Sequence, residues 1–153
     1  MTDLPRPAPE FSLPGDDGTT YSLAGLKGTP FVLFFYPRDN TSGCTKEAIG
    51  FSTLKSEFDA LGVKLFGVSK DSLASHEKFR AKQGLTTGLL SDEDSDACEA
   101  FGVWQEKKMY GKTFFGIVRS TFLIDAAGQI VREWRKVKVD GHAEDVLAAA
   151  RDL

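Results

Sequence analysis

The chain has few of the residues that carry metal, disulfide or polyanion chemistry. Its 153 residues include two cysteines and two histidines, and its net charge is −3. A chain without a basic excess gives no reason to expect nucleic-acid binding, and two cysteines are too few for a disulfide framework. No uncharged apolar run approaches the roughly twenty residues that cross a bilayer. Residues 1–9 lack the basic start and apolar stretch of a secretory signal, so we expect a cytoplasmic protein without membrane contact.

The cysteines and histidines also lack the spacings of common redox and metal motifs. No second cysteine stands near Cys44, which argues against a Cys-x-x-Cys oxidoreductase. The other thiol, Cys98, and the two histidines match no paired-ligand pattern for zinc. We expect His76 to lie in a solvated first turn of a helix and His142 to lie near a helix start.

What the chain does have is the composition and alternation of a globular α/β domain. Hydrophobic residues make up 41% and charged residues 27%, so we expect one domain over residues 1–153. The expected strands are 11–13, 19–23, 31–36, 63–69, a short one around 89–90, 120–125 and 129–139. The expected helices are 42–61, 72–83, one near 95–101 and 142–153.

This order of elements predicts a thioredoxin-like three-layer sandwich. Strand–helix–strand units place parallel strands in one sheet, and a late pair of strands adds antiparallel neighbours. The result is a mixed central β-sheet flanked by helices, with an N-terminal β-hairpin around the turn at residues 14–18. Residues 107–115 are expected to form a loop that covers the site, contacts a partner or packs its two phenylalanines in the core.

Cys44 stands where a buried strand leads through a polar turn into a helix. Residues 31–36 are all apolar, and residues 37–43 are mostly polar. Thr41 and Ser42 are good N-cap residues, so Cys44 falls in the first helical turn. Backbone N–H groups there have no intrahelical partner and carry the positive end of the helix dipole. Such a setting stabilises thiolates, so Cys44 is predicted to be a reactive thiol.

Three further residues fit chemistry at this thiol. Pro37 fixes a backbone angle and can shield the sulfur from water, and the Thr41 hydroxyl can donate to a ligand oxygen. Arg119 begins an expected strand that can lie beside the turn. Its guanidinium would stabilise a thiolate and polarise an incoming oxygen.

The pattern Pro37-x-x-x-Thr41-x-x-Cys44 resembles the active-site motif of the peroxiredoxins. The fuller string over residues 35–45 resembles the peroxiredoxin Q branch, also called bacterioferritin comigratory proteins. The resemblance covers roughly residues 5–150. Supporting strings are Gly67-Val68-Ser69-Lys70-Asp71-Ser72, His76-Glu77-Lys78-Phe79, Leu90-Ser91-Asp92, Tyr110-Gly111-Lys112 and Arg119-Ser120-Thr121-Phe122-Leu123-Ile124-Asp125.

The resemblance implies a thiol peroxidase that reduces hydrogen peroxide and organic hydroperoxides without metal or organic cofactor. Cys44 matches the peroxidatic cysteine, whose thiolate attacks a peroxide oxygen and becomes sulfenic acid. Thr41 matches the hydroxyl that positions the peroxide, and Pro37 matches the shielding residue. Arg119 matches the cation that stabilises the thiolate and the transition state.

The family pattern breaks at the resolving cysteine. In this branch that residue often follows the peroxidatic one by five positions, where this chain has Ile49, or lies on the next helix, around residues 79–81 here, which lack cysteine. The remaining thiol, Cys98, either faces the core of a short helix or resolves Cys44 as a disulfide. In the first case an external thiol acts, such as thioredoxin, glutaredoxin or a small thiol.

Two other questions stay open at the level of sequence. A non-enzymatic redox sensor, in which oxidation of Cys44 is a signal instead of a turnover step, is the main rival to an enzyme. The resembled branch includes monomers and dimers, and no apolar interface stripe stands out, so we expect a monomer or a weak dimer.

Overall fold

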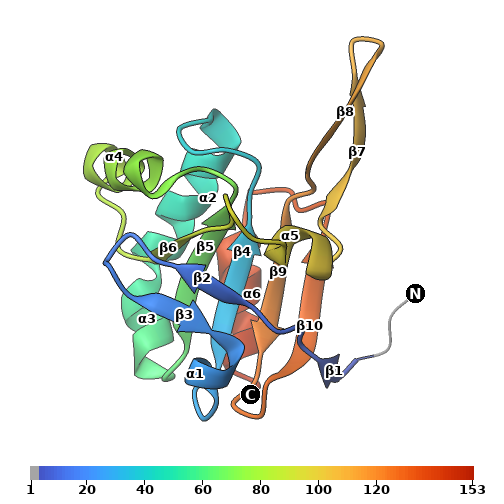
Figure 1. The fold of residues 1–153 in the computed structure, drawn as a ribbon. Coiled ribbons are helices and arrows are strands. Elements are labelled where there is room, and N and C mark those ends of the chain that lie inside the picture. Colours follow the sequence, from blue (N-terminus) through green and yellow to red (C-terminus); the bar gives the residue numbers. More distant parts are fainter. Residues whose placement is uncertain (1–3) are drawn as a thin grey trace.

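The computed structural model describes residues 4–153, apart from the side chain of Met109. Its centre is a six-stranded mixed sheet in the order β1-β10-β9-β4-β5-β6 (Figure 1). Strands β4, β5 and β6 are parallel, whereas β9 pairs antiparallel with both β4 and β10. The strands of this sheet are β1 (Arg6–Pro7), β4 (Phe31–Phe35), β5 (Lys64–Ser69), β6 (Gly88–Ser91), β9 (Ser120–Ile124) and β10 (Gln129–Arg135).

Two hairpins and six helices complete the described part of the chain. The hairpins are β2 (Ser12–Pro14) with β3 (Thr20–Ser22), and β7 (Trp104–Met109) with β8 (Lys112–Ile117). The helices are α1 (Leu23–Leu26), α2 (Ser42–Thr53), α3 (Lys55–Ala60), α4 (Leu73–Gln83), α5 (Ala97–Ala100) and α6 (His142–Ala150). Within residues 4–153, none of these helices has the length and apolar character that spanning a bilayer requires.

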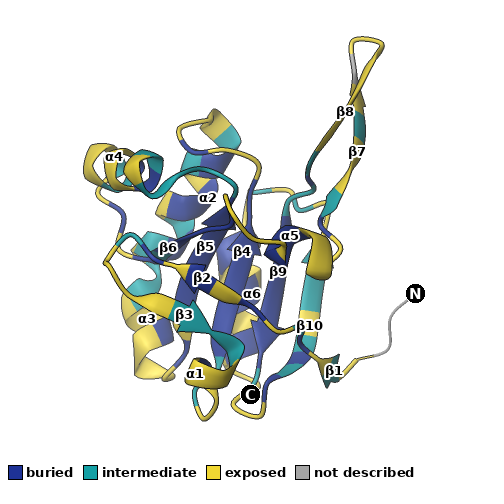
Figure 2. Cartoon of the chain, viewed as in Figure 1, coloured by how far each residue is buried: buried dark blue, intermediate teal, exposed yellow. Residues whose placement is uncertain are grey.

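The sheet is covered on both faces, which confirms the predicted three-layer sandwich and its N-terminal hairpin. Every residue of β4 is buried (Figure 2), as its unbroken apolar run predicts. Leu33 and Phe35 pack in one core cluster, together with residues of β2, α1 and α5. Val32 and Phe34 pack in a second cluster on the opposite face, together with residues of α2, α3, α4 and α6.

The prediction of one long helix over residues 42–61 is wrong, because the helix is interrupted at Leu54 and continues as the separate helix α3. The hydroxyl of Thr53 donates to the Ile49 carbonyl, a local bond that competes with regular helix geometry. Leu54 then closes a tighter turn by donating its N–H to the Phe51 carbonyl. Ile49 is exposed on this helix.

The loop expected over residues 107–115 is also wrong. This segment lies within the β7–β8 hairpin, which projects from the body beyond the end of the sheet (Figures 1 and 2). Its turn is built by Tyr110 and Gly111, both in the left-handed region with φ of 52° and 75°. Turns with two positive φ values match the twist of paired strands.

Candidate active site

Cys44 lies in the first turn of α2, just after the loop that follows β4. Thr41 is the N-cap residue with extended backbone, and its carbonyl accepts the N–H of Thr45. The side chain of Thr41 makes no cap hydrogen bond, so the first N–H groups of α2 are left for other partners. Cys44 is only 1% exposed and is a free thiol. The predicted strand–turn–helix setting of this cysteine is confirmed.

Arg119 is the residue just before β9, and its side chain contacts Cys44. Its Nη2 donates to Cys44 Sγ at 3.2 Å, and its Nη1 donates to Glu47 Oε1 at 2.7 Å. Cys44 and Glu47 stand one helical turn apart on α2, so one planar guanidinium spans both. Gly43 leaves room for this contact, because a Cβ at that position would lie 3.2 Å from Arg119 Nη2. The fold places Arg119 beside the Cys44 thiol, as expected from the sequence.

Glu47 is a buried carboxyl that sequence reasoning missed. Burial raises its pKa to about 7, although the charge of Arg119 opposes that rise. Within residues 4–153, its Oε2 is buried without a hydrogen-bond partner and lies 4.0 Å from His142 Nε2. Burial also lowers the pKa of His142 to about 4, and its Nε2 lies 2.8 Å from Thr121 Oγ1. A neutral imidazole at physiological pH cannot supply Glu47 with a second positive charge.

Glu47 is expected to make stability depend on pH. The folded protein favours the protonated carboxyl, since the pKa is about 7 against an ordinary 4.5. This contribution is fully present below about pH 4.5 and is lost as pH rises through 7. At about 1.36 kcal/mol per unit, Glu47→Gln should gain roughly 2–3 kcal/mol of unfolding free energy relative to wild type between pH 5 and 8. Urea unfolding at both pH values measures this gain.

The exposed carboxyl Glu77, on α4, provides the matched control. Glu77→Gln removes the same charge from a solvated position, so its difference from wild type should stay within about 0.5 kcal/mol at both pH values. An equal difference between Glu47→Gln and wild type at pH 5 and pH 8 would contradict the assignment.

The loop that carries Thr41 is fixed by buried Asp39. Its two carboxylate oxygens accept hydrogen bonds from Tyr36 and Ser75 and contact His76 Nδ1 at 2.7 Å. Its backbone N–H donates to Asp71 Oδ2 at 2.8 Å. These bonds join the end of β4, the loop and α4. They hold the loop that precedes α2 in one conformation.

His76 is fully buried, which corrects the expectation of a solvated residue. Its ring nitrogens face two oxygens, Asp39 Oδ2 and the Leu90 carbonyl at 2.9 Å. Burial opposes a charged ring, yet the hydrogen bond and charge of Asp39 raise the pKa of His76. His76 therefore joins the active-site loop to strand β6 through its two buried contacts, with Asp39 and with the Leu90 carbonyl.

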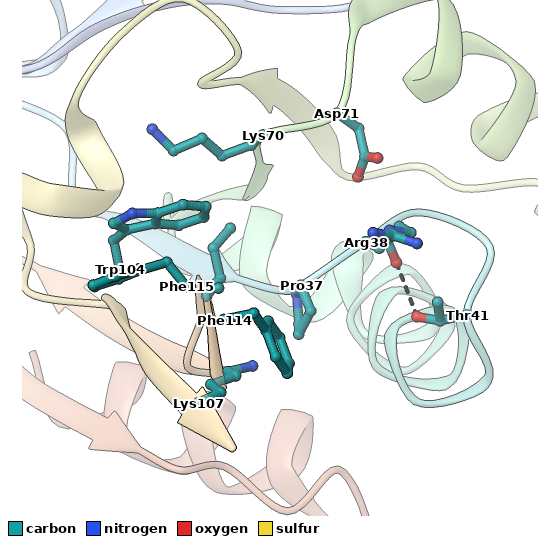
Figure 3. A pocket seen from close by; sticks show the side chains of 11 residues that line it. Pro37, Arg38, Thr41, Lys70, Asp71, Trp104, Lys107, Phe114 and Phe115 are labelled. Atoms are coloured by element: carbon teal, nitrogen blue, oxygen red, sulfur yellow. Dashed lines mark hydrogen bonds between the residues drawn. The ribbon is translucent and has the colours of Figure 1, made fainter. Parts of the chain in front are cut away.

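A pocket of about 410 Å³ opens beside the loop (Figure 3). Pro37 and Thr41 line one side of it, and the Thr41 hydroxyl donates to the Arg38 carbonyl at 2.9 Å. Its other walls come from the two residues that follow β5 and from the β7–β8 hairpin: Lys70, Asp71, Trp104, Lys107, Phe114, Phe115, Gly116 and Ile117. The predicted residues Pro37 and Thr41 thus line this cavity, whereas Cys44 and Arg119 are not among its lining residues.

Cys98 lies on the other side of the central sheet. It belongs to the core cluster of Leu33 and Phe35, whereas Cys44 packs with Val32 and Phe34 on the opposite face. Cys98 is fully buried, and burial followed by the contact with Asp92 raises the pKa of its thiol. A disulfide needs Cα atoms within about 7 Å, so forming a Cys44–Cys98 bond would require α2 and α5 to unwind or shift.

Neither of the two places where this branch often carries its second cysteine holds a thiol in this chain. Ile49 is exposed on α2. Near residues 79–81, Arg80 donates to both carboxylate oxygens of Asp16 and to the carbonyls of Leu85 and Thr87. Arg80 thereby fastens the end of α4 to the N-terminal hairpin.

Of the residues the sequence singled out, the structure brings Cys44, Arg119, Thr41 and Pro37 to one end of the sheet and leaves Cys98 apart. The four residues weighed as a zinc site do not converge, and the described part of the chain holds no cluster of three metal-ligating side chains. Sequence reasoning missed Glu47, whose position three residues after Cys44 was a usable signal. It also missed Asp39 with His76, for which no local signal exists.

Comparisons with known proteins agree with this geometry. The AhpC/TSA family model matches residues 4–133. Peroxiredoxin Bcp of Xanthomonas campestris is 51% identical over 99% of this chain and 97% of its own length. Peroxiredoxin Bcp of Bacillus subtilis is 44% identical over 99% of this chain and 96% of its own.

Solved structures give the same result. The bacterioferritin comigratory protein of Xanthomonas campestris, studied for its alkyl peroxide reduction activity, has a TM-score of 0.88 and 49% identity, covering 93% of this chain and 90% of that one. Peroxiredoxin Q of Xylella fastidiosa has a TM-score of 0.89 and 39% identity, covering 99% of this chain and 98% of that one.

The fold and these relatives define a peroxiredoxin, a thiol-dependent peroxidase among the oxidoreductases. The chain belongs to the AhpC/TSA family, and its relatives at 42–51% identity include several that are called peroxiredoxin Bcp. The substrate of such an enzyme is a peroxide and its reductant is a thiol.

Proposed function

We propose that Cys44 is the peroxidatic residue and that it reduces hydrogen peroxide and alkyl hydroperoxides. The observation that carries this proposal is the 3.2 Å hydrogen bond from Arg119 Nη2 to Cys44 Sγ at the start of α2. Both the guanidinium and the free N–H groups of the first turn favour an anionic sulfur. A single domain over residues 1–153 would carry the activity.

In the first step the Cys44 thiolate attacks one peroxide oxygen. The S–O bond forms as the O–O bond breaks, and the leaving oxygen takes a proton and departs as water or alcohol. Arg119 would stabilise the charge that moves from sulfur to the leaving oxygen. Thr41 would donate its hydroxyl to the bound peroxide in place of the Arg38 carbonyl, and Pro37 would keep bulk water from the sulfur.

In the second step an external thiol reduces the sulfenic acid. Thioredoxin, glutaredoxin or a small thiol fits this need, since Cys98 packs on the opposite side of the sheet. The cycle requires a reduced Cys44, so we place the enzyme in the reducing cytoplasm. We propose a monomer or weak dimer as the working form.

Peroxide treatment without added thiol tests this proposal. One equivalent of peroxide should consume the Cys44 thiol and leave Cys98 titratable after unfolding, as read by peptide mapping under non-reducing conditions. A quantitative Cys44–Cys98 disulfide would overturn resolution by an external thiol. Repeated turnover once dithiothreitol is added would distinguish an enzyme from a sensor oxidised once per molecule.

A further inference from the structure

The β7–β8 hairpin lies outside the central sheet of the peroxidase fold. Its strands pair with each other and with no third strand (Figure 1). Tyr110 at its tip is 96% exposed, and Phe115 is 59% exposed. An isolated two-stranded hairpin is marginally stable in water, so exposed aromatic residues on one call for a binding partner.

The hairpin is basic on an acidic protein. Lys107, Lys108 and Lys112 against Glu106 give residues 104–117 a charge of +2, whereas the whole chain carries −3. In the strand register Lys107 lies opposite Phe114 on one face, and Lys108 lies opposite Thr113 on the other. Both faces therefore present lysine, and neither is an apolar face that packs on the body.

The hairpin forms a wall of the pocket that Pro37 and Thr41 also line. Phe114, Phe115 and Lys107 line this pocket together with Pro37 and Thr41 (Figure 3). Lys107 also lies close enough to Arg119 and Cys44 for their charges to affect its pKa. Burial and the charge of Arg119 lower its pKa, while Cys44 opposes that fall. The hairpin and the loop that leads to Cys44 thus share the walls of one pocket.

We propose that the β7–β8 hairpin docks an acidic dithiol protein that reduces the sulfenic acid of Cys44. This inference rests on the proposed function, in which the reducing thiol comes from outside the chain. The lysines would attract and orient the acidic surface, and Tyr110 would add apolar contact at the tip.

Reduction of the Cys44 sulfenic acid needs no reactant other than the partner's dithiol. One thiolate of the dithiol attacks the Cys44 sulfur, an S–S bond forms, the S–O bond breaks, and hydroxide takes a proton to leave as water. The second thiol of the partner then attacks the partner's own sulfur and releases the Cys44 thiolate. Two electrons pass from the dithiol, which becomes a disulfide.

An acidic partner fits this surface better than a second copy of the chain. A two-fold dimer built on this hairpin would set the same patch against itself, so two charges of +2 would face each other. Small thiols such as dithiothreitol need only the pocket, which makes them a control for the chemistry itself.

The test is a double charge reversal at Lys108 and Lys112, both exposed and outside the pocket. We expect Lys108→Glu with Lys112→Glu to lower kcat/KM for an acidic bacterial thioredoxin by about tenfold at low ionic strength. The loss should shrink to about twofold in 0.5 M salt, because salt screens exposed charges. Turnover with dithiothreitol should stay at the wild-type rate.

The matched control is Lys27→Glu with Lys64→Glu. These exposed lysines stand near the starts of β4 and β5, at the opposite end of the sheet from Cys44. This variant should keep its kcat/KM for thioredoxin. An equal loss in both variants, or no loss in the hairpin variant, would overturn the docking site.

A change of oligomeric state in the hairpin variant, with unchanged kcat/KM for thioredoxin, would equally overturn it in favour of self-association. Failure of the wild type to turn over with dithiothreitol would instead refute the proposed function itself.

Discussion

Cys44→Ser is expected to lower the rate of peroxide turnover at least about a thousandfold, because removal of the nucleophile is among the substitutions that reduce an enzyme's rate most. The serine hydroxyl is not ionised at neutral pH and cannot form the sulfenic acid that the cycle needs. The buried position should accept serine, which fits the volume of cysteine. Peroxide consumption with dithiothreitol as reductant measures the effect.

Cys98→Ser is the matched control, with the same exchange on the other side of the sheet. It should keep turnover with dithiothreitol or thioredoxin within about twofold of wild type, although serine at a fully buried site can cost roughly 1–3 kcal/mol of stability. Loss of turnover in a folded Cys98→Ser protein would show that Cys98 takes part in the cycle.

Arg119→Met is expected to slow the reaction of Cys44 with hydrogen peroxide by about 10²–10³-fold, the usual cost of removing one donor to a developing charge. Methionine keeps much of the length and loses both hydrogen bonds, to Cys44 Sγ and to Glu47 Oε1. The rate is best measured as loss of the titratable thiol in a Cys98→Ser background, where Cys44 is the sole cysteine.

Arg132→Met, on the exposed part of β10, provides the control for loss of an arginine. Glu47→Gln completes a double-mutant cycle with Arg119→Met. Glu47 competes with the thiolate for one guanidinium, so Glu47→Gln alone should leave the rate within about tenfold of wild type. A rate within about threefold of wild type in Arg119→Met would show that the guanidinium does not act on the sulfur.

Much of the fold follows from local patterns that the sequence displays. The apolar run over residues 31–36 predicts a strand buried on both faces, and the structure places it at the centre of the sheet. Ser72 and Gly84 mark the ends of α4, where Ser72 accepts from Ser75 and Gly84 adopts a left-handed conformation. The strand–turn–helix setting of Cys44 was predictable for the same reason.

The features that were missed depend on contacts distant in sequence or on an unusual turn. His76 is a polar residue near a helix start, and its burial is explained by Asp39 and the Leu90 carbonyl, which are 37 and 14 positions away. The β7–β8 turn carries Tyr110 at a positive φ, where asparagine or aspartate is the usual signal. The break at Leu54 lies in an otherwise helical pattern, and a single Thr53 hydrogen bond accompanies it.

The reactivity of Cys44 in the folded protein is the central claim, and its rate of reaction with hydrogen peroxide at neutral pH tests it most directly. In a Cys98→Ser background, the titratable thiol should be lost at least about a hundredfold faster in the folded protein than in the protein unfolded in urea, because only the folded chain places Arg119 beside the sulfur. An equal rate in the folded and the unfolded protein would contradict the account.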